Sequence, residues 1–102
     1  MKSPLIRSVF KDELERNQRL IIRYEKEIEN LPKGSIFHRN IGKQEYLYLN
    51  FRDGSKVISK FLGKSDNFNV EELQSKIEKR KEYVQLVKKL KAEQKELQKA
   101  LK

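Results

Sequence analysis

The sequence predicts a small α+β protein in which a helix, a three-stranded antiparallel β-meander and a long helix follow one another. Apolar residues recur at helical spacing in residues 4–31 and again from residue 70 onward. Between residues 35 and 62, aliphatic residues alternate with aromatic and basic ones, which is typical of strands. A chain of 102 residues has room for one domain, so we expect a single domain over residues 1–102.

The first helix is expected from about residue 4 to residue 31. Ser3-Pro4 suits a helix start, because proline is tolerated at the first helical position, and Leu31-Pro32-Lys33-Gly34 is a stop signal. Apolar residues with one polar member repeat every four and three residues along one face: Phe10, Leu14, Asn17, Ile21, Tyr24, Ile28 and Leu31. The polar residue, Asn17, would fix the packing register if it meets a partner.

The meander is expected to have strands at about residues 35–41, 44–52 and 55–62. Its loops would be Gly42-Lys43 and Asp53-Gly54, and a two-residue Asp-Gly loop favours a type I′ turn. With these loops Tyr48 faces Ser59 and Phe37, and Tyr46 faces Phe61 and Arg39.

Alternation along the strands then divides the sheet into two faces. The aliphatic face would hold Ile36, Leu47, Leu49, Phe51, Ile58 and Leu62, with His38, Lys56 and Lys60 among them. The aromatic face would hold Phe37, Arg39, Tyr46, Tyr48, Asn50, Arg52, Val57 and Phe61. The sequence leaves open which face is buried. If Tyr46, Tyr48 and Arg52 are exposed, the sheet is the expected binding surface, and if the long helix covers them, function lies on the helices.

The long helix is expected from about residue 70 to residue 102. Asn69 is a suitable N-cap with Glu72 as its capping-box partner, and Phe68 and Leu73 are spaced for a hydrophobic staple. The apolar stripe changes direction along this helix, so we expect the first half to pack on the sheet. The second half would pack on the first helix or on a second subunit, which leaves a homodimer as an alternative.

The charge indicates a polyanionic partner. Lys and Arg number 24 against 15 Asp and Glu, and the formal net charge is +9. Two basic rows follow the helices, where a solvated surface is the competing interpretation: Arg16, Arg19, Arg23 and Lys26 on the first helix, and Lys81, Lys88, Lys91, Lys95 and Lys102 on the long one.

Catalytic and metal sites find little support in the sequence. There is no cysteine and one histidine, His38, so thiolate zinc sites and histidine clusters are excluded within one chain. The four glycines are spread one per loop and form no phosphate-binding motif. We therefore expect a protein that is not an enzyme and has no cofactor. No secretory signal or membrane span is visible, which favours a cytoplasmic location.

The hairpin segment GKQEYLYLNFRDGSKVISKFLGK, residues 42–64, resembles a pattern in small proteins of Firmicutes and their mobile elements and near the N-terminus of some transposases. It is also similar to the three-stranded DNA-binding arm of tyrosine recombinases. Ser55 replaces the second glycine of the pattern. The resemblance implies a binding module of a phage or mobile element, working in the host cytoplasm. Small phage proteins of this kind also include anti-CRISPR inhibitors.

These observations lead to three hypotheses. The first is an accessory protein that binds nucleic acid, with DNA favoured over RNA, through the hairpin and the basic rows. Its contact residues would be Arg39, Tyr46, Tyr48, Arg52, Lys56, Lys60, Arg16, Arg19, Arg23, Lys26, Lys81, Lys88, Lys91 and Lys95. The second is an anti-CRISPR-like inhibitor that binds a nucleoprotein complex. The third is a helical dimer or scaffold.

Overall fold

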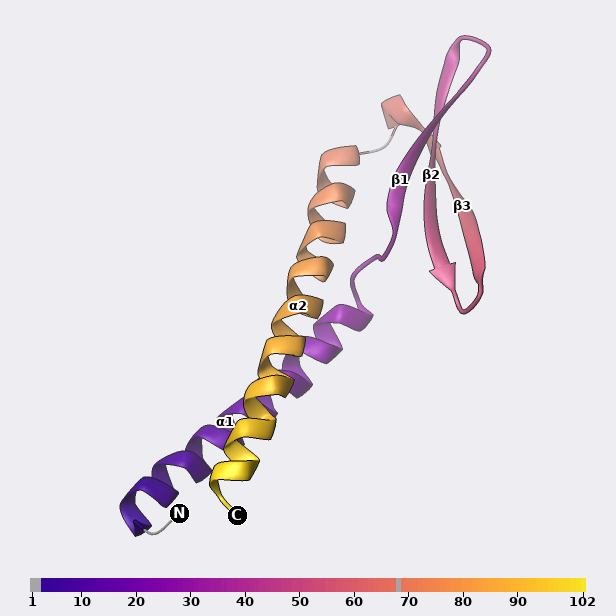
Figure 1. Cartoon of the computed structure of the whole chain (residues 1–102). Helices are drawn as coiled ribbons and strands as arrows, with labels where there is room; N and C mark the ends of the chain where they lie inside the picture. Colours follow the sequence, from indigo (N-terminus) through magenta and orange to yellow (C-terminus); the bar gives the residue numbers. More distant parts are fainter. Residues whose placement is uncertain (1–2, 68) are drawn as a thin grey trace. The chain divides into compact units, whose positions relative to one another are not determined.

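A computed structural model, which describes residues 3–67 and 69–102, has the predicted α+β fold class (Figure 1). The elements are α1 (Pro4–Glu29), β1 (Ser35–Ile41), β2 (Gln44–Asp53), β3 (Lys56–Lys64), the short 3-10 helix η1 (Ser65–Asn67) and α2 (Val70–Ala100). The chain divides into two compact units. The helical unit contains Met1–Asn30 and Glu82–Lys102, and the sheet unit contains Leu31–Lys81.

Helix α1 begins as predicted and ends two residues earlier than predicted. Ser3 is the N-cap, and its hydroxyl accepts a hydrogen bond from the amide of Ile6 at 3.4 Å, with Pro4 in the first turn. Asn30 is the C-cap, and its amide donates to the carbonyl of Glu27. The residue before a proline is disfavoured in the helical region, so Leu31, which precedes Pro32, lies outside the helix.

The helical unit pairs the predicted seam of α1 with the C-terminal part of α2. Asn17 and Ile21 of the seam are buried, and the ring centroids of Tyr24 and Tyr83 lie 4.9 Å apart. Asn17 is 1% exposed and donates through Nδ2 to the carbonyl oxygen of Leu90 at 2.8 Å. Near the chain ends, Arg7 donates to the carbonyl oxygen of Leu101 at 2.8 Å. The second half of α2 thus packs on α1, which was one of the two predicted arrangements.

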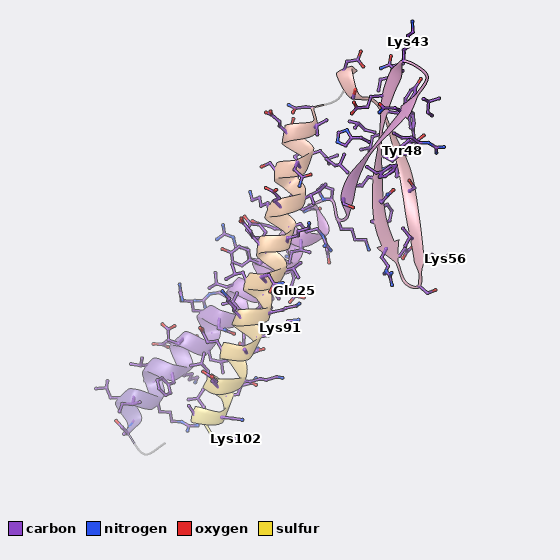
Figure 2. All side chains as sticks on the ribbon, turned by 45° about the horizontal axis from the view of Figure 1, so that its top comes forward. Glu25, Lys43, Tyr48, Lys56, Lys91 and Lys102 are labelled. Atoms are coloured by element: carbon purple, nitrogen blue, oxygen red, sulfur yellow. The ribbon has the colours of Figure 1, made fainter. Side chains whose placement is uncertain are left out.

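The sheet is an antiparallel meander with strand order β1-β2-β3, as predicted. The pairing of β1 with β2 is the predicted one, because Phe37 faces Tyr48, Arg39 faces Tyr46, and the loop is Gly42-Lys43. Figure 2 shows Lys43 and Lys56 at opposite ends of the sheet, with Tyr48 between them.

The second loop differs from the prediction. Asp53 pairs with Lys56, so the loop is Gly54-Ser55 and not Asp53-Gly54. A type I′ turn at the predicted place needs positive φ at Asp53, whereas within residues 3–67 and 69–102 only glycines have positive φ, Gly54 with 63° among them. Glycine first in the loop is the arrangement of a type II′ turn. The shifted loop places Phe61 instead of Ser59 opposite Tyr48. Together with an irregularity between Leu47 and Tyr48 it places Lys64 instead of Phe61 opposite Tyr46.

The core of the sheet unit lies on the aliphatic face. Leu47 and Leu49 of β2 are 0% and 8% exposed, and Ile77 of α2 is 1% exposed. From Lys56 to Phe61, β3 is shifted by two residues along β2 relative to the predicted pairing. Side chains alternate between the two faces with a period of two residues, so each of these residues stays on its predicted face. Leu47, Leu49 and Ile77 thus form the buried centre of this unit, whereas Ile58, on the same face of β3, is 37% exposed.

Helix α2 begins at the predicted N-cap. The Asn69 side chain accepts from the amide of Glu72 through Oδ1 at 3.0 Å, and its Nδ2 lies 3.5 Å from Glu72 Oε2. In a capping box the carboxylate accepts a hydrogen bond from the backbone amide of the N-cap residue. Here the Glu72 carboxylate accepts instead from the side-chain amide of Asn69. The predicted staple depends on Phe68, which lies outside the described residues.

Gly34, at the entry to β1, gives a stability prediction. Its φ is 113°, and a Cβ there would lie 2.2 Å from the carbonyl oxygen of Asn50. Because backbone must move to relieve this overlap, we expect Gly34→Ala to lower the free energy of unfolding by about 3 kcal/mol or more. Gly42→Ala is the control, since its Cβ would meet nothing within 4 Å; it should cost only about 1–2 kcal/mol. Equal shifts of the two urea midpoints would contradict this account.

Candidate functional site

The aromatic face of the sheet is exposed, and we call it the open face. Its members share this face by the observed strand pairing; they are Ser35, Phe37, Arg39, Ile41, Gln44, Tyr46, Tyr48, Asn50, Arg52, Val57, Ser59, Phe61 and Lys64. Phe37, Val57 and Phe61 are 51%, 67% and 56% exposed. Arg39 and Arg52 are exposed, and Tyr46 and Tyr48 are half-buried among their neighbours. None of these residues is buried, whereas Leu47 and Leu49 on the other face are 0% and 8% exposed, so the aliphatic face is the buried one.

The side chains of the open face lie in rows across the strands. The central row is Phe37, Tyr48 and Phe61, one ring from each strand. The ring centroid of Phe61 lies 5.4 Å from that of Tyr48 and 6.0 Å from that of Tyr46, in tilted contacts that favour a fixed ring orientation. The central row is thus an aromatic platform that spans all three strands.

A polar row borders the aromatic platform on one side. Asn50 of β2 pairs with Ser59 of β3, and the Ser59 hydroxyl donates to Asn50 Oδ1 at 2.7 Å. Asn50 and Ser59 also line a shallow hollow of about 170 Å³ on the open face, together with Phe37, Arg39, Tyr48 and Val57. Since Ser59 gives its hydroxyl proton to Asn50, the pair presents the Asn50 amide hydrogens as donors and the Ser59 oxygen as an acceptor.

The cations of the open face lie on both sides of the aromatic platform. Arg39 and Lys64 flank Tyr46 in one row, and Arg52 lies beyond the polar row, next to Val57. Side chains on one face repeat about every 6.8 Å along a strand, so the two cationic ends are about 20 Å apart, the distance from Tyr46 to Arg52. The thirteen strand residues of the open face include no carboxylate. One carboxylate lies at its edge, because Asp66 of η1 accepts a hydrogen bond from the side chain of Gln44, next to the β1–β2 loop.

The sequence pattern does not predict Lys64 on the open face, where it lies opposite Tyr46. Strict alternation from Phe61 would place Lys64 on the aliphatic face, but Leu47 pairs with Gly63 and Tyr48 with Phe61, so β3 contains a bulge at Leu62. The bulge brings Lys64 opposite Tyr46. An isolated glycine inside a strand, Gly63, is the signal that could have predicted it.

Two of the predicted contact residues lie on the other face. Lys56 pairs with Asp53 and Lys60 with Leu49, so both belong to the aliphatic face, although they are exposed on the edge strand β3. The sheet thus brings Arg39, Tyr46, Tyr48 and Arg52 together and separates them from Lys56 and Lys60.

The basic rows of the helices are exposed. Arg16, Arg19, Arg23 and Lys26 belong to the helical unit, as do Lys88, Lys91 and Lys95, whereas Lys81 belongs to the sheet unit. Three of these cations have carboxylate partners: Arg16 with Glu13 at 3.8 Å, Arg23 with Glu27 at 3.8 Å, and Lys91 with Glu25 at 4.0 Å. Figure 2 labels the last pair. Exposed pairs of this kind suit a solvated helix surface.

His38 is not combined with a serine nucleophile in the sheet. Its Nδ1 lies 2.5 Å from Oε1 of Glu45, and both residues are on the aliphatic face. Ser35 pairs with Asn50, so Ser35 and Ser59 both lie on the opposite face from His38. The described residues contain no cluster of three or more His, Asp or Glu that could hold a metal ion. None of the described helices is long and apolar enough to cross a membrane.

Comparisons with known proteins show a family but no function. The comparisons with curated proteins and with solved structures found no match. The sequence pattern of one family matches residues 10–75, which include most of α1, the whole meander and the first turn of α2. Since this match covers more than half of the 102 residues, the chain belongs to the family described as domain of unknown function DUF6788.

Proposed function

We propose that this protein binds nucleic acid through the open face of its sheet and acts without catalysis of its own. The observation that carries the proposal is the composition of that face, whose strand residues include four aromatic rings, three cations and no carboxylate. Phosphates attract Lys and Arg, and base rings stack on aromatic side chains, so both parts of a nucleotide find a matching group here.

A protein ligand fits the open face less well. The exposed rings would suit an apolar partner, but three unpaired cations would have to be desolvated with it. Nucleic acid supplies the compensating charge along its whole length. The net charge of +9 adds a favourable long-range attraction.

The basic rows of the helices would contribute less to binding than the open face. Their cations are spread along exposed helix surfaces, and several are already paired with carboxylates. They raise the local concentration of a polyanion without fixing its position, since exposed charges act at a range of about 10 Å in 0.1 M salt.

Salt dependence and Lys64 together test the proposal. With three phosphate contacts, affinity for a labelled oligonucleotide should fall about 20- to 40-fold between about 50 mM and 200 mM salt. We expect Lys64→Gln to reduce the slope of log affinity against log salt by about 0.7 for a single strand. Fluorescence anisotropy measures both quantities.

Lys60→Gln is the matched control. It removes the same charge from the same strand on the opposite face, so the slope should stay close to the wild-type value. Absence of binding to every DNA and RNA oligonucleotide at low salt would overturn the proposal. Equal slopes for the two variants would show that the open face is not the binding surface.

A further inference from the structure

The rings on the open face can distinguish a single strand from a duplex. Phe37 and Phe61 are the two phenyl rings of the central row, and both are more than half exposed. A phenyl ring has no hydrogen-bonding group, so it cannot read the edge of a base. What it offers is a flat apolar surface, which matches the face of an unstacked base.

A duplex does not expose such base faces. Its bases are stacked on one another, and its grooves present donors, acceptors and methyl groups at the base edges. If the open face lay against a groove, Phe37 and Phe61 would displace water from polar base edges. The phenyl rings cannot supply the hydrogen bonds that the water made, so this contact is unfavourable. A single strand can turn its bases toward the rings.

The surroundings of the rings suit a strand that runs across the open face. Phe61 is braced by ring contacts with Tyr46 and Tyr48 and offers one stacking position. Phe37 borders the hollow of about 170 Å³ that also contains Asn50 and Ser59, and so offers a second position beside a donor and an acceptor. Arg39 and Lys64 lie on one side of these positions and Arg52 on the other, where phosphates would follow.

We propose that the ligand of the open face is a single-stranded nucleic acid with at least two unstacked bases, one on Phe61 and one beside Phe37. This inference rests on the proposed function and names its ligand class. Stacking on rings tolerates all bases, so we expect weak sequence preference with a contribution from Asn50 and Ser59 at one base. Both DNA and RNA offer bases for stacking and phosphates for the cations. Binding is therefore measured separately with DNA and RNA oligonucleotides.

Ring deletions test this inference. Phe37→Ala and Phe61→Ala should each weaken binding of single-stranded oligonucleotides about 5- to 140-fold, the loss expected for one stacked base. Because a phenyl ring carries no charge, the salt slope should not change, in contrast to Lys64→Gln. Circular dichroism of each variant checks that the fold is retained. Mixed-sequence single-stranded DNA, single-stranded RNA and the matching duplex are compared in parallel.

A fluorescence measurement tests the same inference even if the Phe→Ala variants fold poorly. The chain has no tryptophan, so Phe37→Trp places a single indole reporter on the open face. Its fluorescence should be quenched by a single strand and not by the duplex. Binding of duplex as tight as that of single strands, with ring deletions that change nothing, would overturn this inference while leaving nucleic-acid binding in place. Absence of binding to both forms would overturn the proposed function itself.

Discussion

Replacing Asn17 by Asp is expected to lower the free energy of unfolding by about 3–5 kcal/mol. Asn17 is 1% exposed, and its Nδ2 donates to the Leu90 carbonyl at 2.8 Å and to Glu93 Oε1 at 3.3 Å. In N17D an ionised oxygen would face a carbonyl oxygen and a carboxylate where a donor now lies. Its Oδ1 already has no partner among the described residues, so no nearby donor would compensate the new charge.

The pH dependence of N17D separates charge from packing. Burial and the carboxylate of Glu93 raise the pKa of the new carboxyl group in the folded state above its unfolded value. The loss in free energy of unfolding of N17D relative to wild type should therefore be small below the pKa that the new carboxyl group has in the unfolded chain. It should grow as the pH rises toward the higher pKa of the same group in the folded chain. Urea unfolding of N17D and wild type at several pH values measures this difference.

Asn17→Leu is the matched control for packing. It removes both polar atoms, including the unpartnered Oδ1, and keeps a side chain of similar size. We expect the free energy of unfolding to stay within about 1 kcal/mol of wild type or to rise, as when buried polar groups are replaced by apolar ones. A loss in N17L as large as that in N17D would show that the hydrogen bond to Leu90, and not the charge, dominates.

The helices were predictable because their signals are local. Ser3 and Asn69 cap helices through contacts three residues away, and Asn17 was identified from the spacing of the α1 seam alone. The packing of the second half of α2 on α1 remained one of two alternatives. Sequence periodicity shows which side of a helix is apolar but not which element covers it.

The sheet register was predicted less well because it depends on the backbone of single residues. Asp53-Gly54 is a favoured type I′ pair, but the chain places Gly54 first in the loop and keeps Asp53 paired with Lys56. The bulge at Leu62 then moves Lys64 to the open face. Both differences arise from local geometry that alternation rules do not contain.

Four of the predicted contact residues of the sheet share one face, and two do not. Arg39, Tyr46, Tyr48 and Arg52 lie on one strand pair with a loop that was correctly placed, so their common face followed from alternation. Lys56 and Lys60 were grouped with them by charge, although alternation places them on the aliphatic face. Charge in the sequence therefore indicated a polyanion, and only strand geometry shows which cations can act together.

Two double variants with the same net charge test this geometry directly. R39Q/R52Q and K56Q/K60Q each remove two positive charges, which changes the formal net charge from +9 to +7 in both. If affinity followed net charge alone, the two variants would bind a single-stranded oligonucleotide equally. If the open face is the binding surface, only R39Q/R52Q loses phosphate contacts.

The expected difference is large enough for a simple binding titration. Each phosphate contact to a single strand multiplies the binding constant by the salt concentration raised to the power of about −0.7, which is a factor of about five at 0.1 M salt. The loss of two contacts should therefore weaken binding about 25-fold. The salt slope of R39Q/R52Q should fall by about 1.4. K56Q/K60Q should bind within about threefold of wild type, since charges on the far side of the sheet act only through the screened long-range field. Equal losses in the two variants would mean that the protein attracts nucleic acid by its overall charge and that the open face has another ligand.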